Sequence, residues 1–155
     1  EGDSERNPPG AGVNADACVL PTPAPEAAAA LAGVRTVAVV GLSPKPGRPS
    51  HRVAAFLQER GFHIVPIRPA VTKILGEKAY PSLEAYGRPV DVVDIFRRSE
   101  AVPGIVDQAL RTGCRVIWMQ EGIGHEQASD RARAAGIKVV QNRCLEKVLR
   151  AHSPQ

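Results

Sequence analysis

The residues best suited to hold a ligand in this 155-residue chain lie together in one glycine- and proline-rich segment. It reads Gly41-Leu-Ser-Pro-Lys-Pro-Gly-Arg-Pro-Ser50 and follows a short apolar run. Glycines permit a tight turn, serines offer hydroxyl groups, and Lys and Arg offer positive charge. A helix that begins near Pro49 would add free N–H groups and the positive end of its dipole. The segment therefore predicts a cradle for a pyrophosphate-like anion. Its candidate residues are Gly41, Leu42, Ser43, Lys45, Pro46, Arg48 and Ser50.

This segment departs from the two common nucleotide-binding loops. The dinucleotide fingerprint GxGxxG needs a second glycine where the chain has Ser43. NAD also needs an acid near the end of the second strand, where the chain has Arg68. A Walker A loop is excluded because Arg48 follows Gly47 and no GK[ST] occurs. An arginine at that strand end suits a ribose with an extra phosphate, which leaves NADP or coenzyme A. The alternative is an ordinary strand–helix loop with exposed basic residues.

Other reactive side chains give weaker indications of chemistry. Cys144 follows the last expected strand, and the neighbouring Arg143 and a helix N-terminus favour a reactive thiol there, although a half-buried structural cysteine is the alternative. His125 stands where a helix is expected to start, a place where histidine more often caps than catalyses. Asp91 and Asp94 lie three residues apart on one expected strand, so their side chains point to opposite faces. No paired-carboxylate site is therefore expected.

Apolar runs rich in β-branched residues alternate along the chain with segments of helical periodicity. The expected strands span residues 36–41, 63–67, 90–96, 116–119 and 137–140, with a short edge strand at 77–80. The expected helices span residues 26–34, 49–60, 100–112, 126–135 and 145–151, with one helical turn at 82–86. Ser99 is expected to cap the third helix. The alternation predicts an α/β fold, a Rossmann-like, doubly wound and mainly parallel sheet in a single domain of three layers.

The chain divides into two parts by composition. Residues 1–25 are rich in proline, alanine and glycine and predict a flexible N-terminal segment, which either lies along the body or belongs to a partner contact. The folded domain is expected over residues 26–152. Residues 1–35 hold five acidic and two basic residues, whereas the remainder holds 18 basic and 11 acidic residues. This basic body favours an anionic ligand.

Composition also argues against several classes of protein. The 1 Trp, 2 Tyr and 3 Phe are too few to stack the bases of a single-stranded nucleic acid, and Lys and Arg form no run, so no nucleic-acid partner is expected. No apolar run is long enough for a membrane helix, and the acidic start does not fit a secretory signal. The three cysteines form no CxxC pair, which argues against a metal site and favours the reducing cytoplasm.

Five segments in order resemble the small stand-alone CoA-binding proteins, which are similar to the CoA-binding half of the succinyl-CoA synthetase α subunit and of ADP-forming acyl-CoA synthetases. These segments are residues 39–50, 76–82, 90–97, 118–123 and 142–144. The resemblance runs from about residue 28 to 151. It implies a Rossmann fold that takes coenzyme A in the glycine-containing loop.

The resemblance also implies a role for individual residues. Gly41, Ser43, Lys45, Arg48 and Ser50 would face the CoA phosphates, and Arg68, Pro69 and Lys73 would lie near the adenosine 3′-phosphate and base. Phe96 and Arg97 would flank the nucleotide, and Gln120 and Gly122 would approach the pantetheine. The position of Cys144 after the last expected strand separately suggests a thiol near that of CoA, suited to a mixed disulfide or an acyl relay. The chain departs from the family at Arg68, where the family usually has asparagine. This departure affects the expected adenosine contacts.

The resulting prediction is a cytoplasmic protein that binds coenzyme A or an acyl-CoA and is not itself an enzyme. The synthetases use a phosphohistidine from a further domain that a chain of this length does not contain, so a homodimer or a catalytic partner chain is expected. Two other interpretations stay open. One is the remnant of an NADP-binding reductase, and the other is a regulatory or interaction module that senses CoA.

Overall fold

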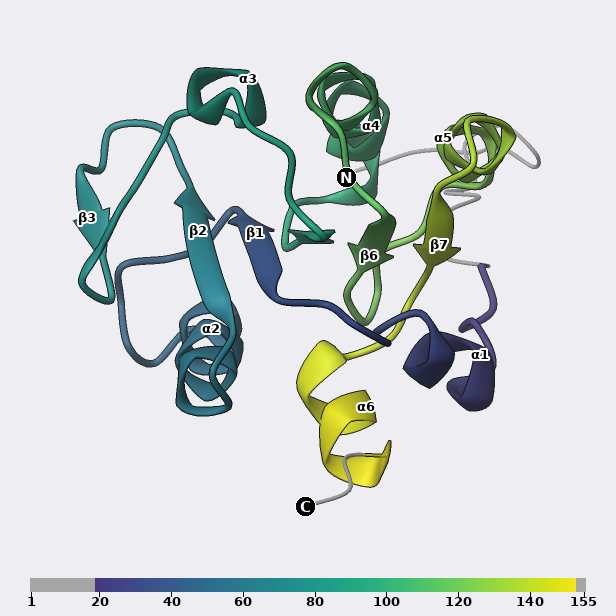
Figure 1. Ribbon diagram of the computed structural model, residues 1–155, viewed down its shortest axis with the longest axis horizontal. Coiled ribbons are helices and arrows are strands. Elements are labelled where there is room, and N and C mark those ends of the chain that lie inside the picture. Colours follow the sequence, from purple (N-terminus) through teal and green to yellow (C-terminus); the bar gives the residue numbers. More distant parts are fainter. Residues whose placement is uncertain (1–18, 153–155) are drawn as a thin grey trace, which may run out of the picture.

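The computed structural model describes residues 19–152, and its centre is a sheet of five parallel strands (Figure 1). The strands lie in the order β2-β1-β5-β6-β7. They are β1 (Thr36–Val40), β2 (His63–Ile67), β5 (Val92–Ile95), β6 (Val116–Met119) and β7 (Lys138–Val140). Nearly every strand residue is buried, because helices cover both faces and the strands are continuous apolar runs rather than alternating ones.

Helices form a layer on each side of the sheet (Figure 1). One layer holds α1 (Ala24–Ala29), α2 (Pro49–Glu59) and α6 (Leu145–His152). The other layer holds α3 (Leu83–Tyr86), α4 (Val102–Thr112) and α5 (Glu126–Ala134). The predicted three-layered, Rossmann-like α/β fold is therefore confirmed. Across residues 19–152, no helix combines the length and apolar character that crossing a membrane requires.

The chain changes direction across the sheet at β1. From β1 it passes through α2 to β2 on one side, and it later enters β5 on the other side of β1. Val40, the last residue of β1, is in register with both Ile67 and Ile95. The carboxyl ends of these three strands therefore meet at one edge. A crevice at such a switch point is the usual ligand site of an open α/β sheet.

Several elements differ from the sequence-based expectations at their ends. The strand β5 is shorter than the predicted 90–96, and α1 lies earlier than the predicted 26–34. The expected edge strand at 77–80 becomes a hairpin of β3 (Lys73–Ile74) with β4 (Glu77–Lys78), followed by a parallel bridge between Tyr80 and Ile67. The prediction that Ser99 caps a helix was wrong. Ser99 starts a 3₁₀ turn, and its hydroxyl oxygen instead accepts a hydrogen bond from the N–H of Gly124.

Residues 19–23, which the sequence places in the N-terminal segment, lie against the domain. Val19 and Thr22 are each 8% exposed. The N–H of Thr22 donates to the carbonyl of Gln141, and the N–H of Gln141 donates back to Thr22 Oγ1. Residues 1–18 and 153–155 lie outside the described residues. The domain boundary at residue 26 therefore stays a prediction.

Candidate ligand-binding site

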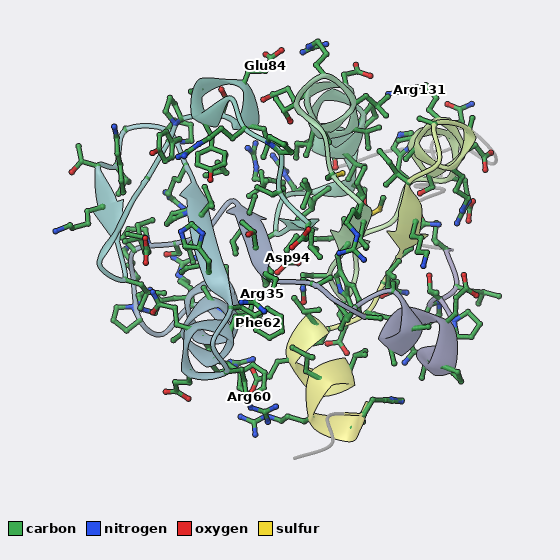
Figure 2. The ribbon with its side chains drawn as sticks, viewed as in Figure 1. Arg35, Arg60, Phe62, Glu84, Asp94 and Arg131 are labelled. Atoms are coloured by element: carbon green, nitrogen blue, oxygen red, sulfur yellow. The ribbon has the colours of Figure 1, made fainter. Side chains whose placement is uncertain are left out.

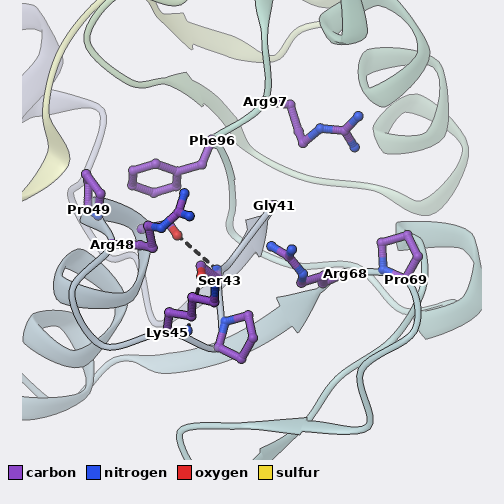
Figure 3. Close-up of a pocket in the computed structure, with 11 residues that line it drawn as sticks. Gly41, Ser43, Lys45, Arg48, Pro49, Arg68, Pro69, Phe96 and Arg97 are labelled. Atoms are coloured by element: carbon purple, nitrogen blue, oxygen red, sulfur yellow. Dashed lines mark hydrogen bonds between the residues drawn. The ribbon is translucent and has the colours of Figure 1, made fainter.

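A cavity of about 690 Å³ opens where the carboxyl ends of β1, β2 and β5 meet (Figure 3). This is the switch-point crevice that the topology predicts, and its volume is typical of small-molecule sites. The residues that line it are Gly41, Ser43, Pro44, Lys45, Arg48, Pro49, Ser50, Arg68, Pro69, Phe96 and Arg97. They come from the loop after β1, the first turn of α2 and the first residues after β2 and β5.

Gly41 allows the ends of β1 and β5 to approach each other closely. Its φ is +89°, and a Cβ at this position would lie 2.8 Å from the carbonyl oxygen of Phe96 and 2.9 Å from Cδ of Arg97. A larger residue would therefore meet both a strained backbone conformation and a steric clash. The glycine is required by the packing of the protein itself, before any ligand is considered.

Two serine hydroxyl groups hold the loop after β1 in shape. Ser50 Oγ accepts a hydrogen bond from the N–H of Ser43 at 2.9 Å, and Ser43 Oγ accepts one from the N–H of Lys45 at 3.1 Å. Ser50 is 4% exposed, so it supports the loop from beneath. In both groups the hydroxyl oxygen is engaged with the backbone, but its own hydrogen remains available to donate. The same serines can therefore shape the loop and donate to an anion.

The N-terminus of α2 faces this loop without a side-chain cap. Arg48 occupies the N-cap position, Pro49 follows in the first turn, and the N-cap side chain makes no capping hydrogen bond. The first turn contains no acidic residue. Uncapped N–H groups and the positive end of the helix dipole favour an anion at this point. The helix is eleven residues long, so its dipole is well developed.

Four basic side chains line the cavity, and no acidic residue does so among the described residues. Lys45, Arg48 and Arg97 are exposed, and Arg68 is half-buried. Arg68 Nη1 donates a long hydrogen bond of 3.4 Å to the carbonyl of Leu42. Figure 3 shows the guanidinium of Arg97 pointing away from Ser43, so this arginine borders the far side of the cavity. The excess of positive charge matches a ligand with several phosphate groups.

Nine of the predicted site residues line this cavity. They are Gly41, Ser43, Lys45, Arg48, Ser50, Arg68, Pro69, Phe96 and Arg97. Sequence reasoning did not include Pro44 and Pro49 among the site residues, although both stand inside the segment it selected. Six predicted residues lie outside the cavity. They are Leu42, Pro46, Lys73, Gln120, Gly122 and Cys144.

Three of these six lie near the loop after β1 or on the β3–β4 hairpin. Leu42 is fully buried and contributes its carbonyl to Arg68. Pro46 lines a shallower depression beside α2 and α6. Lys73 is an exposed residue of β3. Their predicted contacts with a ligand stay predictions.

Gln120 belongs to a buried polar group under the loops at the ends of β5 and β6. Its Nε2 donates to Asp94 Oδ1 at 2.6 Å, and its Oε1 accepts from the N–H of Leu145 at 3.4 Å. Asp94 is fully buried, and its Oδ2 has no partner among the described residues. Burial raises the pKa of Asp94 to about 7, and the hydrogen bond from Gln120 opposes this shift only in part. Near neutral pH this carboxyl group therefore carries a proton for much of the time. Figure 2 shows Asp94 in the interior of the molecule, near the middle of the sheet.

Gly122 and Cys144 lie farther along the carboxyl edge. The N–H of Gly122 is already donated to Asn142 Oδ1 at 2.7 Å. Cys144 is 9% exposed and lines a separate cavity of about 230 Å³, together with Arg143 and Lys147. The structure thus places these two residues away from the cavity at the ends of β1, β2 and β5, here called the cationic cavity. Their predicted approach to a ligand stays a prediction.

The other side chains with catalytic potential form hydrogen bonds that stabilise the fold. His125 caps α5, and its Nδ1 accepts from the N–H of Ala128 at 3.1 Å. Asp91 accepts from the N–H groups of Arg35 and Thr36, whereas Asp94 is buried elsewhere, so the two carboxylates do not pair. Within residues 19–152, no cluster of His, Cys, Asp and Glu is arranged to hold a metal ion.

Three comparisons with known proteins give one consistent result. A family model described as a CoA binding domain matches residues 35–150. The chain is 38% identical over 112 residues to the Bacillus subtilis (strain 168) "Uncharacterized protein YneT", covering 72% of this chain and 83% of that protein. It is 31% identical over 83 residues to "Acetate--CoA ligase [ADP-forming] II" of Archaeoglobus fulgidus, covering 52% of this chain and only 12% of the ligase.

A solved structure agrees with these sequence relatives. A "hypothetical protein from Pyrococcus horikoshii OT3" superposes with a TM-score of 0.79 at 31% identity, covering 86% of this chain and 96% of that one. The matched residues 35–150 include every residue that lines the cationic cavity. On the family match and the shared fold together, the chain belongs to the family of CoA binding domains.

Proposed function

We propose that the protein binds coenzyme A or an acyl-CoA in the cavity at the ends of β1, β2 and β5. The observation that carries this proposal is the lining of that cavity, which combines four basic side chains with the uncapped N-terminus of α2 and has no acidic residue among those described. Coenzyme A carries a pyrophosphate and a 3′-phosphate, so it presents anionic groups at two separated points. The basic side chains are likewise divided among the loop after β1 and the ends of β2 and β5.

Each part of the lining has a distinct task in this proposal. Backbone N–H groups of α2 and the hydroxyl groups of Ser43 and Ser50 donate to the pyrophosphate. Lys45 and Arg48 neutralise its charge, and Arg68 meets the 3′-phosphate beyond the end of β2. Phe96 offers an apolar surface to the nucleotide. The family match and the partial identity to an ADP-forming acetate–CoA ligase support coenzyme A over other polyanions.

The protein is proposed to bind this ligand without catalysing a reaction alone. Among residues 19–152, the cavity is lined by no carboxylate, imidazole or thiol that would serve as a general base or an acyl acceptor. The chain matches only 12% of the Archaeoglobus ligase. A catalytic partner chain would then act on the bound thioester, with a homodimer of this chain as the alternative assembly. The cytoplasm, where coenzyme A is used, is the proposed setting.

Calorimetric titration with coenzyme A, acetyl-CoA, NADP and ATP tests this proposal. We expect coenzyme A to bind at least about tenfold more tightly than NADP, a difference of about 1.4 kcal/mol. The reason is that Ser43 stands where a dinucleotide loop needs a glycine. Equal affinity for NADP would favour a reductase remnant, and absence of CoA binding would refute the proposal. Incubation with acetyl-CoA, ADP and phosphate should yield no acetate or ATP.

A further inference from the structure

The central sheet has two edge strands, β2 and β7, which differ in how they are protected. At the β2 edge, the N–H of Arg68 donates to the carbonyl of Tyr80 at 2.8 Å, and the N–H of Tyr80 donates to the carbonyl of Pro66 at 3.0 Å. The hairpin of β3 and β4 lies beside this edge (Figure 1). At the other edge, no further strand lies beside β7 in the described part of the chain. An open edge of this kind can pair with another chain through its free N–H and C=O groups.

The backbone groups that point outward from this edge are only partly paired. The N–H of Lys138 donates to the carbonyl of Arg115 at 3.0 Å, so the backbone of Lys138 faces β6. Successive residues of a strand alternate in direction, and the N–H and C=O of Val139 therefore point away from the sheet. Gln141 points the same way, but there the N–H of Thr22 donates to the Gln141 carbonyl, and the Gln141 N–H donates to Thr22 Oγ1. The outward N–H and C=O of Val139 have no hydrogen-bond partner among residues 19–152.

The N-terminal residues that pair with Gln141 cannot continue along the edge to Val139. Pro21 and Pro23 flank Thr22, and proline has no N–H to donate to a neighbouring strand. The chain then enters α1 one residue after Pro23. Pairing at the β7 edge therefore ends at Gln141 and leaves the neighbouring outward-facing residue, Val139, open.

A groove of about 350 Å³ runs beside the open part of β7. Ala29 and Ala30 of α1 form one wall, Arg133 of α5 belongs to the other, and residues 137–140 form the floor. Figure 1 shows these two helices on opposite sides of β7. Val139 is only 5% exposed, because the groove is recessed between the helices. An extended chain is slim enough to enter. In a second copy β7 would be recessed between the same helices, which would keep the two edges apart.

Two charged side chains, Glu26 and Lys138, border the groove without an ion-pair partner among the described residues. Arg133, in contrast, is already paired with acidic residues of α5. Lys138 is the first residue of β7, whereas Glu26 lies in the first turn of α1, close in sequence to Thr22 at the other end of the edge. An antiparallel segment opposite Val139 therefore runs from the Glu26 side toward Lys138. It fits best with an acidic residue after the paired one.

We propose that the groove beside β7 binds an extended segment of a partner protein, which adds to the five-stranded sheet as a further strand. One residue of that segment exchanges both backbone hydrogen bonds with Val139, as in an antiparallel pair, so it is not proline. Small apolar side chains of the segment pack on the alanines of α1, and an acidic side chain meets Lys138. The groove lies at the opposite end of the sheet from the cationic cavity, so this inference does not rest on the binding of coenzyme A.

A phage-displayed library of short random peptides, selected against the full chain, supplies the probe. Enriched sequences are synthesised with blocked ends, and their affinities are measured by fluorescence anisotropy. Ala29→Phe places a large side chain in the groove, and Lys138→Glu reverses the charge at its end. Ala134→Phe is the matched control, because Ala134 is, like Ala29, an exposed alanine at the last position of its helix but does not line the groove.

We expect the enriched peptides to share an acidic residue that follows a small apolar one. Their affinity should fall at least about tenfold in Ala29→Phe and in Lys138→Glu, and stay within about twofold of wild type in Ala134→Phe. Methylation of the paired peptide nitrogen should also cost at least about tenfold, because it removes the donor to the Val139 carbonyl. This measurement uses the wild-type protein and so does not depend on the folding of a variant. Hydrogen exchange at the Val139 N–H should slow when the peptide binds.

Failure to enrich any peptide overturns the inference, as does a peptide whose affinity is unchanged both by Ala29→Phe and by methylation at every nitrogen. Two other occupants of the groove have their own signatures. A dimer in sedimentation that Ala29→Phe dissociates would assign the groove to a second copy of the chain. Slow exchange of the Val139 N–H in a monomer without peptide would assign it to residues 1–18. Either result overturns the assignment to a partner protein.

Discussion

Two regions of the same carboxyl edge differ in how fully their polar groups are satisfied. At the ends of β1, β2 and β5, four basic side chains border an open cavity, and three of them are exposed. At the ends of β6 and β7, the polar side chains of Gln120, Gln141 and Asn142 are engaged with backbone and side-chain partners. A buried polar group gains stability from such partners, whereas a basic group without an acidic neighbour is ready for an anionic ligand.

This contrast predicts that substitutions in the two regions affect different properties of the protein. Changes in the cationic cavity should weaken ligand binding and leave the free energy of unfolding nearly unchanged. Changes in the polar network at β5, β6 and β7 should alter stability and leave CoA affinity nearly unchanged. The following experiments are ordered by the size of the expected effect.

The largest expected effect concerns the buried carboxyl of Asp94. Its pKa is about 7 in the folded protein, against 3.8 for an ordinary aspartate, so folding favours the protonated form. Between about pH 4 and 7 the folded state binds more protons than the unfolded state, and stability therefore falls as pH rises through this range and is level above it. The rise of this pKa from 3.8 to about 7 corresponds to a loss of at most about 4 kcal/mol in the free energy of unfolding. Asp94→Asn should remove this dependence and unfold at higher denaturant than wild type at pH 8.

Asp91→Asn is the matched control for this experiment, because Asp91 is shifted in the opposite direction. Partial burial raises its pKa, but the N–H groups of Arg35 and Thr36 and the guanidinium of Arg115 outweigh burial and hold the pKa below its ordinary value. Its stabilising effect is present above the ordinary pKa and is lost as pH falls below it. Asp91→Asn should therefore be less stable than wild type at neutral pH. An unchanged pH dependence in Asp94→Asn would contradict the assignment.

The next effect is on binding. Replacing Lys45 and Arg48 together by alanine removes two charge-assisted contacts to the phosphates, each worth roughly 1.5–3 kcal/mol when desolvated and less at an exposed site. We expect CoA affinity to fall about tenfold or more, which is at least about 1.4 kcal/mol. Denaturant unfolding of the same variant should stay within about 0.5 kcal/mol of wild type. A stable fold with unchanged affinity would remove the phosphates from this loop.

The difference between the two regions also explains which features can be predicted from the sequence alone. The alternation of apolar strands and helices predicts the sheet, and the residue types from Gly41 to Ser50 predict the anion cradle, because both are local patterns. Which polar groups are already engaged depends on contacts between distant residues. Gln120 meets Asp94 across 26 residues, and Thr22 meets Arg143 across 121. By residue type, Gln120, Gly122 and Cys144 fit a contact with the ligand as well as the loop residues do. Only the tertiary structure shows that they do not line the cavity.

Contacts of single residues at the strand ends are also not predicted by the sequence. Ser99 has the residue type of a helix cap, but its hydroxyl is used by Gly124 in a neighbouring loop. Composition places residues 19–23 in a flexible N-terminal segment that lies along the body or belongs to a partner contact, since prolines and alanines bury little apolar surface. The contact of Val19 with Gly124, which depends on the missing side chain of that glycine, is visible only in the tertiary structure. Local chemistry thus predicts what a residue can do, and tertiary packing decides which partner it has.

The smallest effect concerns the adenosine end of the ligand, where the family resemblance leads us to expect an asparagine and the chain has Arg68. Arg68 is half-buried and makes only a long hydrogen bond of 3.4 Å to Leu42, so its guanidinium can turn toward a phosphate at little cost. If it meets the 3′-phosphate, coenzyme A should bind more tightly than dephospho-CoA. Arg68→Ala should narrow this difference by about threefold to tenfold, or roughly 0.7–1.4 kcal/mol, with little effect on dephospho-CoA.

Lys73→Ala is the control variant for this experiment. The family resemblance places Lys73 near the same phosphate, whereas the structure places it on β3, outside the residues that line the cavity. Titration of both variants with coenzyme A and dephospho-CoA separates the two positions. A narrowed difference in Arg68→Ala alone places the 3′-phosphate at the end of β2. A narrowed difference in Lys73→Ala alone would move it over the hairpin of β3 and β4, and the cationic cavity would then hold only the pyrophosphate.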